Sequence, residues 1–448
     1  MQNGEGIVAI ETQPRIETRV WTTELGAHIG ERVRVEGWLH AVRRLGGVSF
    51  LVIRDGWGLV QAVASEAALA ALGDAGVESI VSVDGTAVAE AQAPGGVELH
   101  DPTIHVRVPV TEAPPLSLNK RELKATLATQ LDNGVLAARH PKQRSMFRMS
   151  AGVMRAYREI LTAEGFTEVQ TPKLVASATE SGANVFKIDY FGRPAYLAQS
   201  PQLYKQVMTG VFERVFEVGP VFRAEPHDTT RHLSEYVSLD MEMAFIQDHR
   251  TVMAMLTKVI RGVLAALQER HAEDLARWEV VMPNAPAEFP SIYFPDAQHL
   301  IYERHGVDVR GEPDLSPQDE RWLGEWARET YGSDFLFVTG YPMSKRPFYT
   351  HPNPADERFS NSFDLLFRGT ELVTGGQRLH LYADYLAALE RAGMSAEPFE
   401  WYLEAFKYGM APHGGFAIGL ERLLMQLTGV GNLRLATIFP RDLNRLTP

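Results

Sequence analysis

Five short runs rich in β-branched residues dominate the first quarter of this 448-residue chain. They lie at residues 32–42, 48–55, 59–64, 78–88 and 104–110, and each has the length of one strand. Turn-forming sequences separate them at residues 45–47, 55–58, 93–96 and 100–102. The stretch 65–75 is instead typical of a short helix. Five strands with one inserted helix predict a small closed barrel.

The chain divides into a barrel, a hinge and a larger domain. We place the barrel at residues 17–110; the oligonucleotide-binding (OB) barrel has this strand count, although an unrelated small β domain also fits. Residues 111–145 begin Pro-rich and continue charged and helix-prone, which is typical of a hinge. From residue 146 a long helical pattern ends at Gly165, and strand-like runs then alternate irregularly with helices. This order favours an α+β domain at 146–448, on a mostly antiparallel sheet with flanking helices.

Composition excludes several classes of protein. The formal net charge of −12 argues against a passive nucleic-acid coat, because phosphate binding needs Lys and Arg, although local basic patches remain possible. The absence of cysteine excludes a disulfide framework, a thiolate zinc site and an iron–sulfur cluster. Residues 1–14 lack the basic flank and apolar run of a signal peptide, and no uninterrupted apolar stretch approaches membrane-spanning length. We therefore expect a soluble cytoplasmic protein with no membrane partner.

The first cluster of chemistry-bearing residues lies at residues 223–236. Arg223 ends an apolar strand-like run, where a cation is costly unless it is paired or faces a cleft. A dense polar stretch follows, with Glu225, Arg231, His232 and Tyr236. This pattern suits a nucleotide site in which an arginine binds a phosphate. A strand-end ion pair between Arg223 and Glu225 is the alternative interpretation.

Two glycine-containing stretches form the second and third clusters. Residues 413–422 combine small residues, which let a backbone approach a ligand, with Arg422 at the start of a helix; a tight strand–turn–helix is the alternative. Residues 371–378 carry Glu371 and Thr374, and a carboxylate with a hydroxyl suits Mg²⁺ bound together with substrate phosphates. Simple alternation places Glu371 and Arg378 on opposite faces, and we expect the glycine pair 375–376 to break it. An ordinary exposed strand end is the alternative here.

The fourth cluster surrounds Lys205, in the first turn of a predicted helix at residues 202–210. A cation there opposes the helix dipole, so a bound anion would account for it. A solvated surface lysine is the alternative. All four clusters fall within the one domain that follows the barrel.

Three stretches resemble the signature motifs of the class II aminoacyl-tRNA synthetases. Residues 214–245 resemble motif 2, residues 415–427 resemble motif 3, and the helix before residues 165–174 resembles motif 1, with Pro172 at its proline. The resemblance runs from the barrel to residues 439–448 and is greatest to the archaeal-type aspartyl enzymes of the aspartyl/asparaginyl subgroup. The large insertion of the bacterial aspartyl enzymes is missing between motif 2 and Glu371. Motif 1 implies a homodimer.

The resemblance implies sites for ATP and Mg²⁺. Arg223 would grip the α-phosphate and Arg422 the γ-phosphate of a bent ATP, with Glu371 as a third catalytic group. Glu371 and Thr374 would hold Mg²⁺. The further ATP contacts that the resemblance implies are Glu225, Arg231, His232, Leu233, Tyr236 and Gly419. Ala417 replaces the middle glycine of motif 3, and Ser181 replaces a glycine of the loop at residues 178–182 that closes over the amino acid.

The resemblance also implies an amino-acid substrate. Lys205 and Arg378 match the two cations that hold the side-chain carboxylate in aspartyl enzymes, and Asp240 matches the residue on the substrate ammonium. The other aspartate contacts that it implies are Glu180, Gln202 and Thr374. Since a buried cation without its anion is expensive, such a pocket should reject asparagine. We therefore predict aspartate; the alternatives are an asparaginyl enzyme, an asparagine-forming paralogue and a non-catalytic nucleic-acid-binding relative.

In the barrel, the resemblance implies an anticodon site. Phe50 would stack on an anticodon base, and Gln61 and Glu98 would hydrogen-bond bases; a core Phe and exposed polar residues are the alternative. His40 and Pro94 replace a tryptophan and a lysine that face the third anticodon base in strictly tRNA(Asp)-specific archaeal enzymes. We predict that losing these contacts lets the enzyme aspartylate both tRNA(Asp) and tRNA(Asn), the second product feeding a tRNA-dependent amidotransferase. A discriminating enzyme for tRNA(Asp) only is the alternative.

Overall fold

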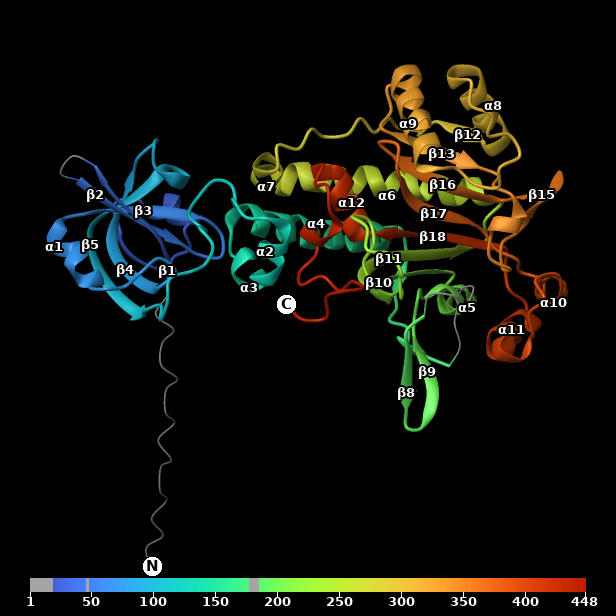
Figure 1. Ribbon diagram of the computed structural model, residues 1–448, viewed down its shortest axis with the longest axis horizontal. Coiled ribbons are helices and arrows are strands. Elements are labelled where there is room, and N and C mark those ends of the chain that lie inside the picture. Colours follow the sequence, from blue (N-terminus) through green and yellow to red (C-terminus); the bar gives the residue numbers. More distant parts are fainter. Residues whose placement is uncertain (1–18, 46–47, 177–184) are drawn as a thin grey trace, which may run out of the picture. The chain divides into compact units, whose positions relative to one another are not determined.

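The computed structural model describes residues 19–45, 48–176 and 185–448 (Figure 1). They belong to two compact units, Met1–His140 and Pro141–Pro448. The boundary between the units falls within residues 111–145, where α2 (Leu127–Asp132) and α3 (Gly134–Ala137) also lie.

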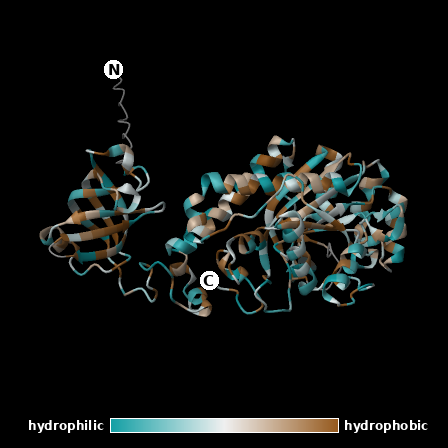
Figure 2. Cartoon of the chain, turned by 90° about the horizontal axis from the view of Figure 1, so that it is seen from above, coloured by the Kyte–Doolittle hydropathy of each residue, from teal (hydrophilic) through white to brown (hydrophobic). Residues whose placement is uncertain are grey.

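The first unit contains a closed five-stranded barrel. Its strands follow the order β1-β2-β3-β5-β4, with bounds β1 (Arg32–Leu45), β2 (Val48–Arg54), β3 (Leu59–Ala64), β4 (Ile80–Ala89) and β5 (Val97–Val108). The helix α1 (Glu66–Leu69) and the 3₁₀ turn Ala70–Leu72 form the short helix predicted at residues 65–75. Alternate residues of each strand, such as Val35, Leu51 and Val60, fill the barrel interior, and brown hydrophobic residues run along these strands (Figure 2). The predicted barrel is therefore confirmed.

One predicted turn of the barrel is wrong. Residues 100–102 do not reverse the chain but lie inside β5, which begins at Val97 rather than at residue 104. Asp101 has a φ of 50°, and the pairing of β4 with β5 shifts between Asp84 and Thr86. These features mark a β-bulge, in which one strand takes up extra residues without ending. The longer strand brings Glu98 into the barrel beside β3.

The second unit is built on an eight-stranded sheet in the order β12-β13-β16-β17-β18-β11-β10-β6. The bounds are β12 (Ser291–Tyr293), β13 (Phe335–Thr339), β16 (Ser362–Phe367), β17 (Glu371–Gln377), β18 (His413–Gly419), β11 (Glu235–Ala244), β10 (Arg214–Phe222) and β6 (Thr167–Glu168). Only the outermost pairs, β12 with β13 and β10 with β6, are parallel among the described strands of this sheet. The predicted α+β architecture on a mostly antiparallel sheet is confirmed.

Two smaller sheets and several helices complete this unit. The small sheets pair β14 (Pro352–Asn353) with β15 (Asp356–Ser360), and β9 (Arg193–Leu197) with both β7 (Leu174–Val175) and β8 (Lys187–Tyr190). The helices are α4 (Pro141–Ala163), α5 (Gln202–Phe212), α6 (His249–Arg270), α7 (Ala272–Arg277), α8 (Phe294–His305), α9 (Pro317–Tyr331), α10 (Tyr382–Arg391), α11 (Glu400–Lys407) and α12 (Leu420–Thr428). α4 begins at Pro141, before the predicted start at residue 146, because proline is well tolerated in the first turn of a helix.

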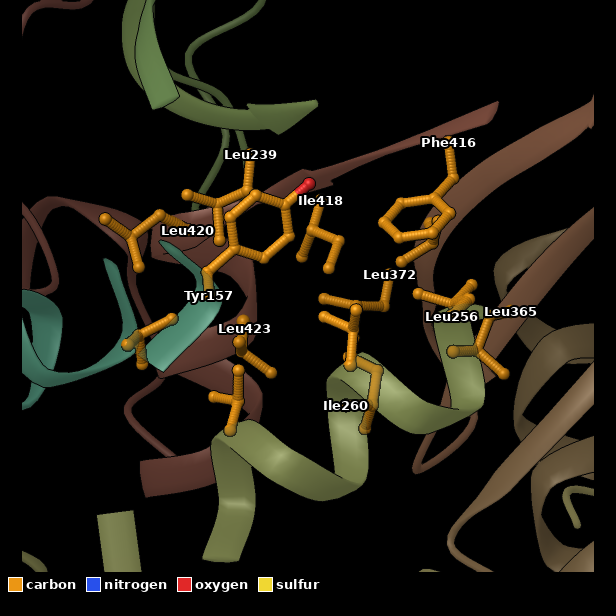
Figure 3. Packing of buried hydrophobic residues seen from close by; sticks show 14 of the residues in the cluster. Tyr157, Leu239, Leu256, Ile260, Leu365, Leu372, Phe416, Ile418, Leu420 and Leu423 are labelled. Atoms are coloured by element: carbon orange, nitrogen blue, oxygen red, sulfur yellow. The ribbon is translucent and has the colours of Figure 1, made fainter. Parts of the chain in front are cut away.

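One helix, α6, is long and apolar enough to cross a membrane, judged by length and composition alone. Core helices pass the same test, and the apolar side chains of Val252, Leu256 and Ile260 pack into the main core. Figure 3 shows Leu256 and Ile260 of α6 against Tyr157 of α4 and Ile418 of the sheet.

Strand alternation gives the sheet two chemically different faces. Along β11, Leu239, Met241 and Met243 belong to the main apolar core, which also holds side chains of α4 and α6. The residues between them, such as Asp240 and Glu242, must therefore point to the opposite face, where they are buried but polar. The same alternation along β18 and β17 creates a polar floor in the middle of the sheet.

Candidate active site

A cavity of about 470 Å³ opens over this polar floor. It gathers nearly every residue for which we predicted a role in binding ATP, amino acid or metal. The predicted residues that line it are Gln202, Arg223, Glu225, Arg231, His232, Leu233, Tyr236, Asp240, Glu371, Thr374, Arg378, Gly419 and Arg422. Ala417, the departure from motif 3, also lines it. Glu180 and Ser181 lie outside the described residues.

The connection between β10 and β11 supplies one end of the cavity. Arg223 follows the last residue of β10, and its N–H donates to the carbonyl of Ser234 at 2.9 Å. The Arg223 guanidinium lies 5.8 Å from the ring centroid of Tyr236, a residue that pairs with Val221 across the two strands. Burial lowers the pKa of His232. This end therefore offers cations and a flat aromatic surface.

A β-bulge in β17 brings Glu371 to the cavity. Leu365 of β16 pairs with Val373 and Leu366 pairs with Glu371, so Leu372 is an extra residue. The bulge places Glu371 on the same face as Thr374, with 3.4 Å between Glu371 Oε1 and Thr374 Oγ1. Our expectation that the glycine pair 375–376 breaks the alternation was wrong, because the break already lies at Leu372.

Glu371 also contacts the arginine of motif 3. Arg422 Nη1 donates to the carbonyl oxygen of Glu371 at 3.1 Å and lies 3.3 Å from its Oε1. Both side chains remain more than one-third exposed, at 35% and 41%. They are therefore open to a charged ligand in the cavity.

Four buried charges meet at the other end of the cavity, and two of them, Lys205 and Glu242, lie behind its lining. Lys205 Nζ lies 2.9 Å from Asp240 Oδ1 and 3.4 Å from Glu242 Oε2. Arg378 Nε donates to Glu242 Oε1 at 2.9 Å, and its Nη2 donates to the carbonyl of Gly415 at 3.0 Å. A Cβ at Gly415 would lie 2.2 Å from Glu242 Oε2, so glycine is required for this approach. The two cations thus share Glu242.

This arrangement changes two expectations for Lys205. Lys205 is 1% exposed, which excludes the alternative of a solvated surface lysine. However, it is not among the lining residues and lies behind Asp240, whereas Arg378 faces the cavity. The pattern of the sequence did not point to Glu242, whose carboxylate balances the second cation. Arg378 and Glu242 stabilise each other, since Arg378 and Lys205 lower the pKa of Glu242 against the effect of burial.

Two further carboxylates lie behind Glu371. Glu320 of α9 accepts a hydrogen bond from the Glu371 N–H at 3.0 Å, and burial raises its pKa to about 7. Asp364 of β16 contacts Arg346 at 3.0 Å, and burial raises its pKa to about 6. Asp364 could have been noticed as an acid within an apolar strand next to Glu371, but Glu320 lies on a distant helix with no motif.

The donor groups around Glu371 fit a metal bound jointly with a ligand. Within residues 19–45, 48–176 and 185–448, no three His, Asp or Glu side chains gather to hold a metal ion. Mg²⁺ usually takes only one or two carboxylates from a protein and completes its shell with substrate phosphates and water. Glu371 and Thr374 would supply the protein part of such a shell.

The barrel brings three predicted anticodon residues onto neighbouring strands. Phe50 lies on β2, and Val52 of the same strand pairs with Gln61 of β3, which pairs with Glu98 of β5. Gln61 Nε2 donates to Glu98 Oε2 at 3.0 Å. Phe50 and Gln61 are half-buried and alternate with the core positions, so both face outward. They therefore lie on the outward side of two neighbouring strands.

Pro94 and His40, the two positions that led us to predict charging of both tRNAs, do not both face outward as Phe50 and Gln61 do. Pro94 begins the 3₁₀ turn Pro94–Gly96 before β5. His40 is only 6% exposed, because a register shift between Leu39 and Ala41 turns it inward. Its Nδ1 lies 3.3 Å from Nη1 of Arg54, and burial lowers its pKa to about 4. Our expectation that His40 faces an anticodon base was therefore wrong for this structure.

Comparison with known families adds two matches. The family of class II tRNA synthetases for D, K and N matches residues 126–443. The OB-fold nucleic acid binding domain matches residues 33–107.

Similar proteins extend over nearly the whole chain. An aspartate–tRNA(Asp/Asn) ligase of Deinococcus radiodurans is 46% identical and covers 96% of this chain and 99% of its own length. A ligase of the same name from Thermus thermophilus is 44% identical, with coverage of 96% and 100%. The crystal structure of asparaginyl-tRNA synthetase from Pyrococcus horikoshii with asparaginyl-adenylate has a TM-score of 0.89 at 33% identity and covers 96% of this chain and 100% of its own.

Proposed function

The chain belongs to the class II aminoacyl-tRNA synthetases of the aspartate, lysine and asparagine group, and we propose that it activates L-aspartate with ATP and transfers it to tRNA. One observation carries this proposal: a single cavity holds Arg223 and Arg422 together with Asp240 and Arg378. Arg223 and Arg422 suit the phosphates of ATP. Asp240 and Arg378 suit the ammonium and the side-chain carboxylate of aspartate. The absence of cysteine is in keeping with a cytoplasmic enzyme.

In the first step, the substrate α-carboxylate attacks the α-phosphorus in line and pyrophosphate leaves. Arg223 at the α-phosphate and Arg422 at the γ-phosphate hold these groups and neutralise the negative charge that develops. Tyr236 offers its ring to adenine. When bound by Glu371 and Thr374 with the phosphates, Mg²⁺ supplies further neutralisation of charge.

In the second step, the 3′-hydroxyl of the terminal adenosine of tRNA attacks the mixed anhydride. The ester bond forms and AMP leaves. A phosphate oxygen of the adenylate can accept the hydroxyl proton, so the step needs no protein base.

Selection of aspartate over asparagine follows from Arg378. Its guanidinium carries five N–H donors and no acceptor, and Glu242 occupies only part of this set. A substrate carboxylate accepts from the remaining donors. The NH₂ group of asparagine would instead bring a donor against donors, and a site built for hydrogen bonding rejects such an analogue strongly.

ATP–pyrophosphate exchange tests this assignment. We expect exchange with aspartate and near-background exchange with asparagine; the reverse result would assign an asparaginyl enzyme. Arg223→Ala should abolish exchange without changing the thermal midpoint, whereas Arg250→Ala, at an exposed side chain paired with Asp248, should change neither. Full activity of the Arg223 variant would refute its role.

We further propose that the enzyme charges both tRNA(Asp) and tRNA(Asn), as the names of the two relatives suggest for those proteins. Pro94 lies at the entrance to β5, and His40 would act through Arg54 rather than by touching a base. Purified tRNAs and labelled aspartate test the proposal. Aspartylation of tRNA(Asn) at less than a hundredth of the efficiency for tRNA(Asp) would identify a discriminating enzyme.

Two partners follow from this proposal. Asp-tRNA(Asn) would be the substrate of a tRNA-dependent amidotransferase, and the resemblance to motif 1 supports a homodimer. Light scattering of the purified protein measures the mass directly; a monomer would contradict the dimer.

A further inference from the structure

Four fully buried polar side chains contact one another behind the amino-acid end of the cavity. They are Gln206 of α5, Tyr385 of α10, Tyr402 of α11 and His413 of β18, and each is 0% exposed. We call this set the polar lock. Its members come from as far apart as 207 positions in the chain, so only the folded unit assembles it.

Polar contacts of the four side chains converge on the amide oxygen of Gln206. This oxygen lies 2.7 Å from the hydroxyl of Tyr402, 3.0 Å from that of Tyr385 and 3.2 Å from His413 Nε2. The Tyr385 hydroxyl also lies 2.8 Å from the carbonyl oxygen of Leu379. Since each hydroxyl carries one proton, the shortest contacts have Tyr402 donating to Gln206 and Tyr385 donating to Leu379.

Each of these acceptors is adjacent to a charged residue of the amino-acid end. Gln206 follows Lys205 on α5, and Leu379 follows Arg378. His413 completes the connection, because its carbonyl accepts the N–H of Arg378 at 2.9 Å. The polar lock therefore restrains the backbone on which both buried cations are carried.

Two helices outside the large sheet supply the hydroxyls. α10 and α11 pack against each other, and α11 packs against α5 (Figure 1). Tyr385 and Tyr402 lie in an apolar cluster with Leu203, Phe399 and Phe406. Phenylalanine would fill this space without the cost of burying a hydroxyl. The hydroxyls therefore orient the groups that they contact rather than fill space.

We propose that Tyr385 and Tyr402 are positioning residues for recognition of the aspartate side chain. They hold the backbone of Lys205 and Arg378 so that both side chains contact Glu242. The segment 382–407 therefore contributes to amino-acid specificity although it does not line the cavity. This inference rests on the proposed function. It requires that loss of either hydroxyl weakens amino-acid binding while ATP binding is unchanged.

Full-length Tyr385→Phe and Tyr402→Phe variants test the inference. Each should raise the KM for aspartate in ATP–pyrophosphate exchange about five- to tenfold, the effect of one lost buried hydrogen bond, with the KM for ATP within twofold of wild type. The ratio of exchange with aspartate to exchange with asparagine should fall by a similar factor.

Two controls separate positioning from stability. Tyr204→Phe makes the same substitution beside Lys205, at a ring that stacks on Trp401 outside the polar lock, and should leave both KM values unchanged. Phe399→Leu disturbs the same apolar cluster and should lower the thermal midpoint without raising the KM for aspartate. The inference would be overturned if Tyr385→Phe and Tyr402→Phe lowered the thermal midpoint without raising the KM for aspartate. It would also be overturned if they raised the KM values for aspartate and ATP together. Wild-type exchange without aspartate dependence would overturn the proposed function itself.

Discussion

Among single residues, we expect substitution of Glu242 to affect both stability and the use of aspartate. It is fully buried and contacts both Lys205 and Arg378. Glu242→Gln should lower stability by about 3–5 kcal/mol, because it leaves the buried Arg378 without its counter-charge, whereas Lys205 keeps Asp240. It should also reduce kcat/KM for aspartate more than tenfold, because Arg378 loses the charged carboxylate that holds its guanidinium, while the KM for ATP stays unchanged. Thermal melts and exchange kinetics measure the two effects.

Glu217→Gln is the matched control for this prediction. Glu217 is 2% exposed on β10 and pairs with the partly exposed Lys173, so its substitution also removes the charge of a buried carboxylate from an ion pair. It should lower stability without a selective effect on aspartate. Equal kinetic effects of the two variants would show that Glu242 acts on the fold alone.

A second residue, Glu421, predicts a pH dependence. Burial raises its pKa to about 7 from 4.5 in the unfolded chain, although it accepts from the N–H of Val237. The folded state therefore holds its proton more tightly, and its contribution to stability falls as pH rises from about 4.5 to 7. Glu421→Gln should remove this fall and stabilise the free enzyme above pH 7 by up to about 3 kcal/mol. Urea unfolding at pH 5 and pH 8 gives the free energy of unfolding at each pH. If this free energy changes equally with pH in wild type and in Glu421→Gln, the prediction is contradicted.

The sequence pointed to half of the residues that line the cavity. Strand ends, glycines and cations that are costly to bury mark places where a ligand must explain the residue, as with Arg223 and Arg378. Counter-charges are harder to predict. Glu242 and Glu320 were missed because an acid in an apolar strand or on a distant helix acquires meaning only when folding brings its partner close.

At the scale of elements, the segment after α12 is predicted to hold the loop between β10 and β11. Arg434 is 7% exposed; its Nη1 donates to the Thr229 carbonyl at 3.1 Å, and its other nitrogens contact Asp228 and Asp442 at 2.5 Å. Arg434→Lys keeps the charge but loses the planar set of N–H donors that makes these three contacts. It should raise the KM for ATP about fivefold or more, because Arg231 and His232 of this loop line the cavity, and leave the KM for aspartate unchanged.

Arg304→Lys, on α8 with its partner Glu329, provides the comparison for Arg434 and should have no kinetic effect. A fall in thermal midpoint with an unchanged KM for ATP would limit Arg434 to a structural role. The opposite selectivity of Arg434→Lys and Tyr385→Phe would show that separate elements position the two substrates.

Whole elements were predicted more securely than their irregularities. Runs of β-branched residues marked the barrel strands, and helical patterns marked α4 and α5, since each signal follows from local geometry. The bulges at Asp101 and Leu372 could not be predicted in this way. A bulge depends on the register of the neighbouring strand, which the local sequence does not contain. One bulge turned a predicted turn into a strand, and the other brought Glu371 to the cavity.

Across the whole molecule, the two units should divide the reaction between them. Every predicted ATP and aspartate residue that the structure describes lies in the second unit, whereas Phe50 and Gln61 lie in the first. Phe50→Ala should therefore leave ATP–pyrophosphate exchange unchanged. It should raise the KM for tRNA(Asp) in aspartylation about ten- to a hundredfold, because one stacked base contributes about 1–3 kcal/mol.

Ile29→Ala removes an exposed apolar side chain from the same unit and should alter neither reaction. If Phe50→Ala impairs exchange and aspartylation equally, the barrel acts on adenylate formation and the division of labour fails. If it impairs neither reaction, Phe50 does not stack on an anticodon base, and the proposal that the outward face of β2, β3 and β5 binds RNA is contradicted. A selective rise in the KM for tRNA is the only outcome consistent with RNA binding on the barrel and chemistry in the second unit.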